Sequence, residues 1–240
     1  MKNQYFGDIN DYKKYGLLRL LSNNGNNKIA VCWMLTADGQ QTDGQLIGYL
    51  KCPGKWKKYD SQLFDLLQPC LDDPSKRNVS RAAKFNIIPG AKYQTQLLTD
   101  NAAERECYFQ EFMTIAQTCD LSFFDPDNGL EVKSKSIGRH NSCKYLYWHE
   151  LKQVWAQGQS LLIYQHFPRI EHKKFIKTLI DKACSELNVS DVITYRTSRV
   201  VFLLIPKMRH EAYYLQQSQF VKQIWDDQIQ FGGIGDKPNM

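Results

Sequence analysis

Paired cysteines are missing from this sequence, and with them the usual signature of a structural zinc site or a disulfide framework. Seven cysteines are scattered over 240 residues, and no two of them are separated by only two residues. Zinc ligands normally come in closely spaced pairs, and an odd number of cysteines does not form a complete set of disulfides. We therefore expect reduced thiols, most of which serve as small apolar side chains of the core.

Long apolar segments are also missing. No stretch approaches the roughly 20 apolar residues that a membrane-spanning helix needs. The opening residues, Met-Lys-Asn-Gln-Tyr, do not form the apolar run of a signal peptide. These two absences predict a cytoplasmic protein without a membrane partner.

Internal repeats and linkers rich in Pro, Gly or Ser are absent too. We therefore expect one domain over residues 1–240, in which residues 51–90 are a candidate for a small insertion. The composition, 42% hydrophobic and 23% charged, is typical of a folded globular chain. The net charge of +6, from 31 basic and 25 acidic residues, permits nucleic acid as a partner but does not require it.

Apolar runs alternate with amphipathic segments along most of the chain. The expected strands are residues 28–35, 46–50, 91–98, 121–124, 160–165, 192–195 and 200–205. The expected helices are residues 11–22, 60–71, 101–118, 145–157, 171–187 and 211–225. This alternation predicts a Rossmann-like α/β three-layer sandwich with a mostly parallel sheet. The last two strands are too close for a helical crossover, so we expect them to form an antiparallel pair.

Three polar segments follow predicted strands, and ligands of open α/β sheets bind beyond the carboxyl ends of the strands. These segments are residues 38–44, 125–131 and 165–169. The middle one, Asp125-Pro126-Asp127-Asn128-Gly129-Leu130-Glu131, carries carboxylates, a carboxamide and a glycine directly after a buried strand. A tight turn alone would explain some of these residue types. Because Glu131 and Lys133 exceed what a turn requires, we favour a functional loop with Asp125, Asp127 and Asn128 as candidate catalytic residues.

Two further clusters add candidate residues. The segment Gly7 to Tyr15 opens the first helix and contains Asp8, Asp11 and Lys14, which belong either to a site or to an ordinary capped helix. After the fifth expected strand, His166 is a candidate acid or base and equally a structural histidine. Arg169 is either a clamp for phosphate or carboxylate or a surface residue.

Together these segments resemble, distantly, the large-subunit ribosomal RNA adenine-N6 methyltransferases. That family opens with Gly-Asn-x-x-Asp-x-x-Lys-His, and its catalytic loop is Asp-Pro-Pro-Tyr followed by Glu. The corresponding loop here is Asp125 to Asn128, with Glu131 nearby. Asp127 and Asn128 replace the proline and tyrosine that hold the flipped adenine in the family. The residues that stand in the places of the opening motif are Gly7, Asp8, Asp11, Lys14 and Tyr15, so that Asp8 replaces the asparagine and Tyr15 the histidine.

The resemblance implies an S-adenosylmethionine-dependent methyltransferase-like protein that acts on nucleic acid or a nucleotide. Asp125 and Asn128 would hold the target amine. Lys14, a further candidate catalytic residue, would meet phosphate together with Arg169. The family's donor loop maps to residues 35–44, which retain acidic residues and glycines but not the usual pattern. The implied donor-binding residues are Asp38, Gly39, Asp43 and Gly44. The implied substrate-binding residues are Asp8, Asp11, His166 and Arg169.

Two other classes of function remain open. The first is a magnesium-dependent nuclease or phosphohydrolase, in which Asp125, Asp127 and Glu131 are hard oxygen ligands and Lys133 orients the attacking water. The second is a non-catalytic relative that keeps the methyltransferase fold and binds a partner. A methyltransferase would need no metal, because the sulfonium supplies the leaving group and the enzyme supplies alignment.

Overall fold

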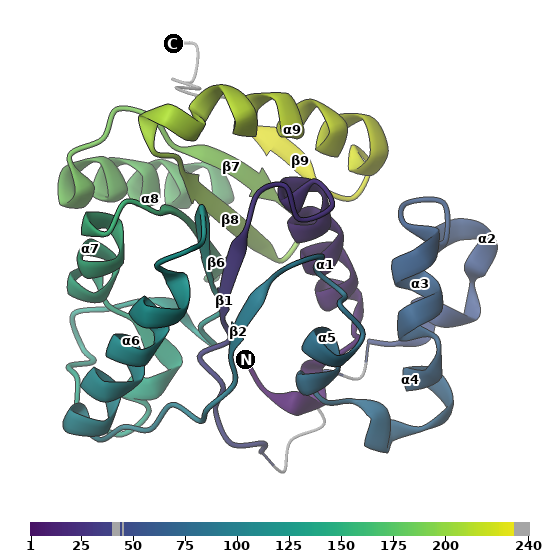
Figure 1. The fold of residues 1–240 in the computed structure, drawn as a ribbon, viewed down its shortest axis with the longest axis horizontal. Coiled ribbons are helices and arrows are strands. Elements are labelled where there is room, and N and C mark those ends of the chain that lie inside the picture. The colour runs from purple at the N-terminus through teal and green to yellow at the C-terminus, as the bar shows by residue number, and fades with distance from the viewer. Residues whose placement is uncertain (40–43, 45, 233–240) are drawn as a thin grey trace.

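The computed structural model describes residues 1–39, 44 and 46–232, and a seven-stranded sheet lies at its centre (Figure 1). In spatial order the strands are β2 (Lys92–Gln94), β1 (Ile29–Cys32), β3 (Leu121–Phe124), β6 (Ser160–His166), β8 (Val200–Ile205), β7 (Ile193–Arg196) and β9 (Gln230–Gly232). The first four pair in parallel, and β8 is antiparallel to both β6 and β7. β9 adds an antiparallel edge to β7. The Rossmann-like α/β fold and its antiparallel C-terminal strand pair are thus confirmed.

Helices cover both faces of the sheet, which explains why the strands read as nearly unbroken apolar runs. Along β1, Ile29 and Val31 face one buried cluster, while Ala30 and Cys32 face the other. One face is covered by α6 (Ala102–Ala116), α7 (Trp148–Ala156) and α8 (His172–Leu187). The opposite face is covered by α1 (Ile9–Ser22), α9 (Glu211–Trp225) and the short helices after β1.

Helices α1 and α9 lie in close contact at a glycine. A Cβ atom on Gly16 would lie 2.2 Å from Cζ2 of Trp225, so only glycine leaves room for the indole ring. Trp225 is 1% exposed and stacks on Tyr59 with ring centroids 4.9 Å apart. This contact fixes the position of α1 on the sheet, and α1 carries the polar residues of the N-terminal segment.

Short helices fill the region between β1 and β2. They are η2 (Gly48–Lys51), α2 (Pro53–Trp56), α3 (Ser61–Leu67), α4 (Pro69–Asp72), η3 (Pro74–Lys76) and α5 (Ser80–Lys84). The prediction of a strand at 46–50 was wrong, because this segment turns to bury Tyr49 and Leu50 in the core. The expected helix 60–71 is broken, because Pro69 has no N–H to continue the hydrogen-bond ladder.

A second, two-stranded parallel sheet lies beside the main one. It joins β4 (Gly129–Leu130), directly after the Asp125 loop, to β5 (Tyr145–Leu146). The expected helix 145–157 therefore starts later, at Trp148, after a short strand. None of the helices in the described part of the chain has the length and apolar character needed to cross a membrane.

Candidate functional site

The polar segments at 7–15 and 125–127 meet at the carboxyl edge of the main sheet. In sequence, β1 is followed by β2 on one side, whereas β3 lies on its other side, so the strand order reverses between β1 and β3. Ligands of doubly wound sheets bind in the crevice at such a point. A hollow of about 290 Å³ opens there. Among its lining residues are Met1, Asp8, Asp11, Lys14, Gly44, Asp125, Asp127, Tyr164, His166 and Arg199.

The start of α1 is shaped by its two aspartates. Asp8 caps the helix and accepts hydrogen bonds from the backbone N–H groups of Asn10, at 2.7 Å, and Asp11, at 2.9 Å. Asp11 Oδ2 accepts from the Gly7 N–H at 3.1 Å and from the Tyr15 hydroxyl at 3.0 Å. The capped-helix interpretation and the site interpretation therefore apply to the same residues, because the cap itself lines the hollow.

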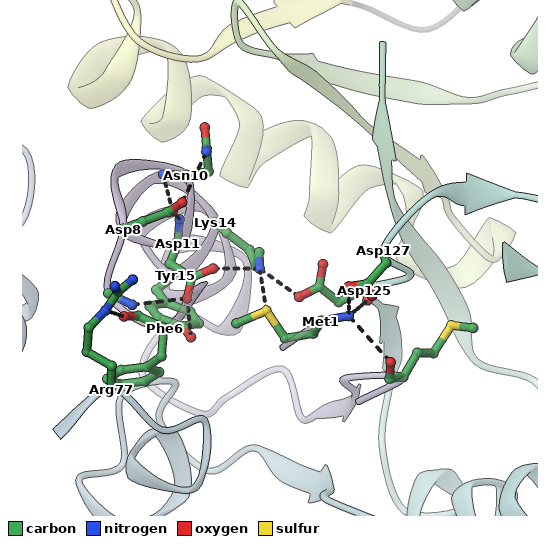
Figure 2. A network of polar contacts seen from close by, with 12 residues as sticks. Met1, Phe6, Asp8, Asn10, Asp11, Lys14, Tyr15, Arg77, Asp125 and Asp127 are labelled. Carbon is green, nitrogen blue, oxygen red and sulfur yellow. Dashed lines mark hydrogen bonds and ion pairs between the residues drawn. The ribbon is translucent and has the colours of Figure 1, made fainter. Parts of the chain in front are cut away.

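Lys14 joins the two segments through a buried ion network (Figure 2). Its Nζ lies 2.7 Å from Asp11 Oδ1 and 2.6 Å from Asp125 Oδ2, and Lys14 is only 2% exposed. The same ammonium lies 4.9 Å from the ring centroid of Tyr164. Burial alone would lower the pKa of Lys14, but the two carboxylates raise it above its usual value. Lys14 therefore stays charged and orients Asp125; this geometry gives no support to the expected phosphate contact.

The hollow carries an excess of acid, because Lys14 is shared between two carboxylates and Asp8 lies nearby. Burial and the neighbouring Asp11 raise the pKa of Asp8 to about 7, against the backbone hydrogen bonds at the helix cap and the charge of Lys14. Burial also raises the pKa of Asp11; Lys14 opposes this shift and Asp125 adds to it. The site therefore holds one carboxyl group, that of Asp8, which can take up a proton near neutrality, and it can accept a cationic group when Asp8 is ionised.

Asp127 is engaged by other partners. Its Oδ1 lies 2.7 Å from the ammonium of Met1, and its Oδ2 accepts from the Thr36 hydroxyl at 2.6 Å. The Met1 ammonium also donates to the backbone carbonyl of Asp125 at 3.0 Å. Burial would raise the pKa of Asp127, but the Met1 ammonium and the Thr36 hydroxyl hold it below its usual range. Asp127 is thus an ionised residue that fixes the loop after β3.

His166, at the end of β6, and Arg199, just before β8, are lining residues that are exposed, and this side of the hollow is here called its mouth. The residue His166 is exposed overall, but the protein around its ring removes part of its hydration and lowers its pKa. Asp125 opposes this shift and Lys14 adds to it. Arg199 was missed by the sequence analysis. The antiparallel pair predicted at the C-terminus was the signal that could have found Arg199. The turn between its two strands contains Arg199 and lies beside the end of β6, where Val200 pairs with His166. Arg169 is exposed and does not line this hollow.

Arg77 is a second residue near the hollow that was not predicted from the sequence. It is 9% exposed and donates to the backbone carbonyls of Phe6, at 3.0 Å, and Gly44. It therefore ties the region of short helices to the two backbone segments that border the hollow. In the sequence Arg77 is one of several basic residues in a polar segment, so only the folded chain distinguishes it from its neighbours.

The expected donor loop reaches the hollow only in part. Asp38 is exposed and accepts from the Gln4 N–H at 3.2 Å, and the Gly39 N–H donates to Gln4 Oε1 at 3.1 Å. Neither residue lines the hollow, whereas Gly44 does. Asp43, the remaining residue proposed for donor binding, lies outside the described residues.

The three proposed magnesium ligands are not brought together. Glu131 accepts from the Trp148 N–H at 3.3 Å, and it lines a separate hollow that also includes Lys133. Asn128 is exposed, and its backbone N–H donates to the Lys144 carbonyl at 2.9 Å. Within residues 1–39, 44 and 46–232, no group of three His, Cys, Asp or Glu side chains is placed to hold a metal ion.

Gly129 is the residue at which the loop after Asp125 most needs glycine. Its φ is +93°, and a Cβ atom there would lie 2.2 Å from Gln165 Oε1, which accepts the Leu130 N–H at 2.7 Å. We expect Gly129→Ala to lower the free energy of unfolding by about 2–3 kcal/mol, from backbone strain plus the lost hydrogen bond. Urea denaturation measures this change.

Gly138→Ala is the matched control for that experiment. Gly138 also has a positive φ, +81°, but no atom lies within 4 Å of the position a Cβ would occupy. Its substitution should therefore cost only the backbone strain, about 1 kcal/mol. Equal losses in the two variants would contradict a specific contact between Gly129 and Gln165.

No protein-family model matches the chain, and no curated protein sequence is significantly similar to it.

Proposed function

We propose that the acidic hollow is the active site of a methyltransferase-like enzyme, with S-adenosylmethionine as donor and an amino group of a nucleic acid base or nucleotide as acceptor. The contact between Lys14 and Asp125, at 2.6 Å, is the observation that carries this proposal. It joins the two segments on which the methyltransferase resemblance depends, at the point of the sheet where ligands bind. The proposal rests on this convergence and on the chemistry of the lining.

The proposed acceptor site is the carboxylate of Asp125. Its Oδ2 is held by Lys14, whereas none of the described residues donates a hydrogen bond to Oδ1. An amino group placed there would donate to Oδ1, and the fixed carboxylate would hold its nitrogen in line with the methyl group. Lys14 is then a positioning residue, because its donors are directed at protein atoms.

The lining also suits the proposed donor, which carries sulfonium and ammonium charges. Asp8 lines the hollow and supplies negative charge there when it is ionised. S-adenosylmethionine would supply the methyl group with its leaving group. The protein would supply alignment and a preorganised electrostatic environment. Arg199, at the mouth, is placed to meet a phosphate of the acceptor in the role that the sequence assigned to Arg169.

The first test is isothermal titration with S-adenosylmethionine, followed by a methyl-transfer assay on RNA, DNA and nucleotides with labelled donor. We expect donor binding without added metal. Asp125→Asn should keep the affinity for the donor within about threefold and lower the rate of methyl transfer by at least about 100-fold. The neutral amide no longer stabilises the positive charge that develops on the target amine. Circular dichroism would verify that the variant is folded.

Asp38→Asn provides the matched control, since the same substitution is made at an exposed aspartate that does not line the hollow. It should leave donor binding and methyl transfer unchanged. Binding of Mg²⁺ that is lost in Asp125→Asn would instead support the phosphohydrolase alternative. Absence of both donor and metal binding would overturn the enzymatic proposal.

A non-catalytic binding protein is the second candidate. The observation in its favour is that the charges inside the hollow already have protein partners: Lys14 pairs with Asp125, and the Met1 ammonium pairs with Asp127. We further propose a cytoplasmic location for either function. The seven free cysteines are consistent with a reducing compartment.

A further inference from the structure

Residues 131–144 form an excursion, here called the basic excursion, between the two strands of the small sheet. The parallel pairing of β4 with β5 closes its base. The Leu130 N–H donates to Gln165 Oε1, at the carboxyl end of β6, so the excursion leaves the main sheet at the same edge as Asp125 and His166. The base of the excursion therefore lies at the same edge of the sheet as the acidic hollow.

Positive charge is concentrated on this excursion. It contains four basic residues and one acidic residue, in a chain whose net charge is +6. A hollow of about 670 Å³ lies against it and is lined by Lys133, Lys135 and Glu131 of the excursion and by Lys182 of α8. Lys133, Arg139 and Lys182 are exposed, and none of them forms an ion pair with any residue that the structure describes.

The excursion is held in one shape by bonds from the body of the domain. The Asp100 carboxylate accepts from the backbone N–H groups of Asn141 and Cys143, both at 2.8 Å. Arg105 donates to the carbonyls of Ser142, at 3.2 Å, and Tyr145, at 2.7 Å. The cationic side chains are thus mounted on a fixed backbone, which lowers the entropic cost of binding an extended partner.

We propose that the basic excursion, together with Lys182, binds the phosphodiester backbone of a nucleic acid strand. Repeated phosphates match exposed cations that form no ion pair within the described chain, and binding of this kind is driven by counterion release. The chemistry of the surface favours nucleic acid over a membrane, because Val132, at 44% exposure, is the one large apolar side chain exposed on the excursion. Membrane-surface segments instead present several bulky apolar residues.

The proposed binding surface gives the acidic hollow a substrate class, since a strand bound there would run past its mouth. The proposal of nucleic acid binding is independent of methyl transfer, because it is argued only from the charge and the position of the excursion. Backbone contacts position a strand without reading its sequence. We therefore expect affinity for single-stranded RNA and DNA of mixed sequence, with a strong dependence on salt.

The test uses fluorescence anisotropy of labelled single-stranded RNA and DNA over a series of salt concentrations. The variant combines Lys133→Gln, Arg139→Gln and Lys182→Gln, three exposed sites whose loss leaves the anchoring bonds intact. We expect the affinity to fall by at least about tenfold. The plot of log K against log salt should become less steep by about 2, because three phosphate contacts are lost and each contributes about 0.7 to the steepness for a single strand.

The control variant carries the same change of charge at Lys51→Gln, Lys55→Gln and Lys84→Gln, which are exposed on the short-helix region. It should bind within about twofold of the unmodified protein. Equal weakening by both variants, or no binding to either nucleic acid at low salt, would overturn the proposal. So would a preference for vesicles that contain phosphatidylserine. Donor titration on the same proteins separates these outcomes from a failure of the methyltransferase proposal.

Discussion

Replacing Lys14 with methionine is expected to lower the free energy of unfolding by about 3–5 kcal/mol, because removal of one partner leaves buried charge uncompensated. The side chains of Lys14, Asp11 and Asp125 are each no more than 3% exposed, so solvent screening compensates only weakly for the missing ammonium. Methionine fills a similar volume, and the loss would therefore reflect charge and not a cavity. Urea denaturation at neutral pH is the measurement.

The loss in Lys14→Met should depend on pH in a defined direction. Burial already raises the pKa of Asp11 in the folded protein, and removal of the opposing ammonium raises it further. A carboxyl whose pKa is higher in the folded than in the unfolded state costs nothing while both states are protonated. It destabilises progressively as the pH rises from about 4, the unfolded value, towards the folded value. The deficit should therefore be larger at neutral pH than at pH about 5.

Lys13→Met is the matched control, since it removes the same charge from the adjacent position. The Lys13 ammonium is 5.7 Å from the ring centroid of Trp56, and the residue is partly exposed. Its loss should cost less than about 1 kcal/mol. Similar losses in the two variants, or a loss in Lys14→Met that does not vary with pH, would contradict the buried network described above.

Replacing Arg105 with methionine is also expected to lower the free energy of unfolding by about 3–5 kcal/mol, because it leaves a buried charge without its partner. Arg105 Nε lies 2.5 Å and Nη2 3.0 Å from the two carboxylate oxygens of Glu150, and Arg105 is 2% exposed. The variant would leave Glu150 buried without its cation. Chemical denaturation measures the loss of stability.

Arg105→Met should also loosen the basic excursion, because the guanidinium donates to the carbonyls of Ser142 and Tyr145. Hydrogen exchange should therefore increase in residues 131–147 before the sheet opens. Lys152→Met is the control. Its ion pair with Glu186 lies at the surface, with 49% of the lysine side chain exposed, so its removal should cost under about 1 kcal/mol. Unchanged exchange in the excursion would show that Arg105 does not hold it.

The elements that the sequence predicted best are those whose apolar pattern is bounded by strong local signals. The strand at 121–124 and the helix at 211–225 have the same bounds in the structure as in the sequence analysis. The expected strand at 46–50 failed, because its apolar residues pack as a single turn against α1 and α3. Periodicity reports which residues are buried, but in so short a segment it does not distinguish a strand from a turn.

By itself, the sequence determined the class of fold and the edge of the sheet at which polar residues gather, because hydrophobic periodicity and turn chemistry are local properties. Only the tertiary structure decided how those residues combine. It pairs Lys14 with Asp125, separates Glu131 from Asp127, and brings Arg199 to the mouth in place of Arg169. Such partnerships depend on side-chain directions and on burial across distant segments. Burial also sets the strength of each charge, so the chemistry of the site appears only once the chain is folded.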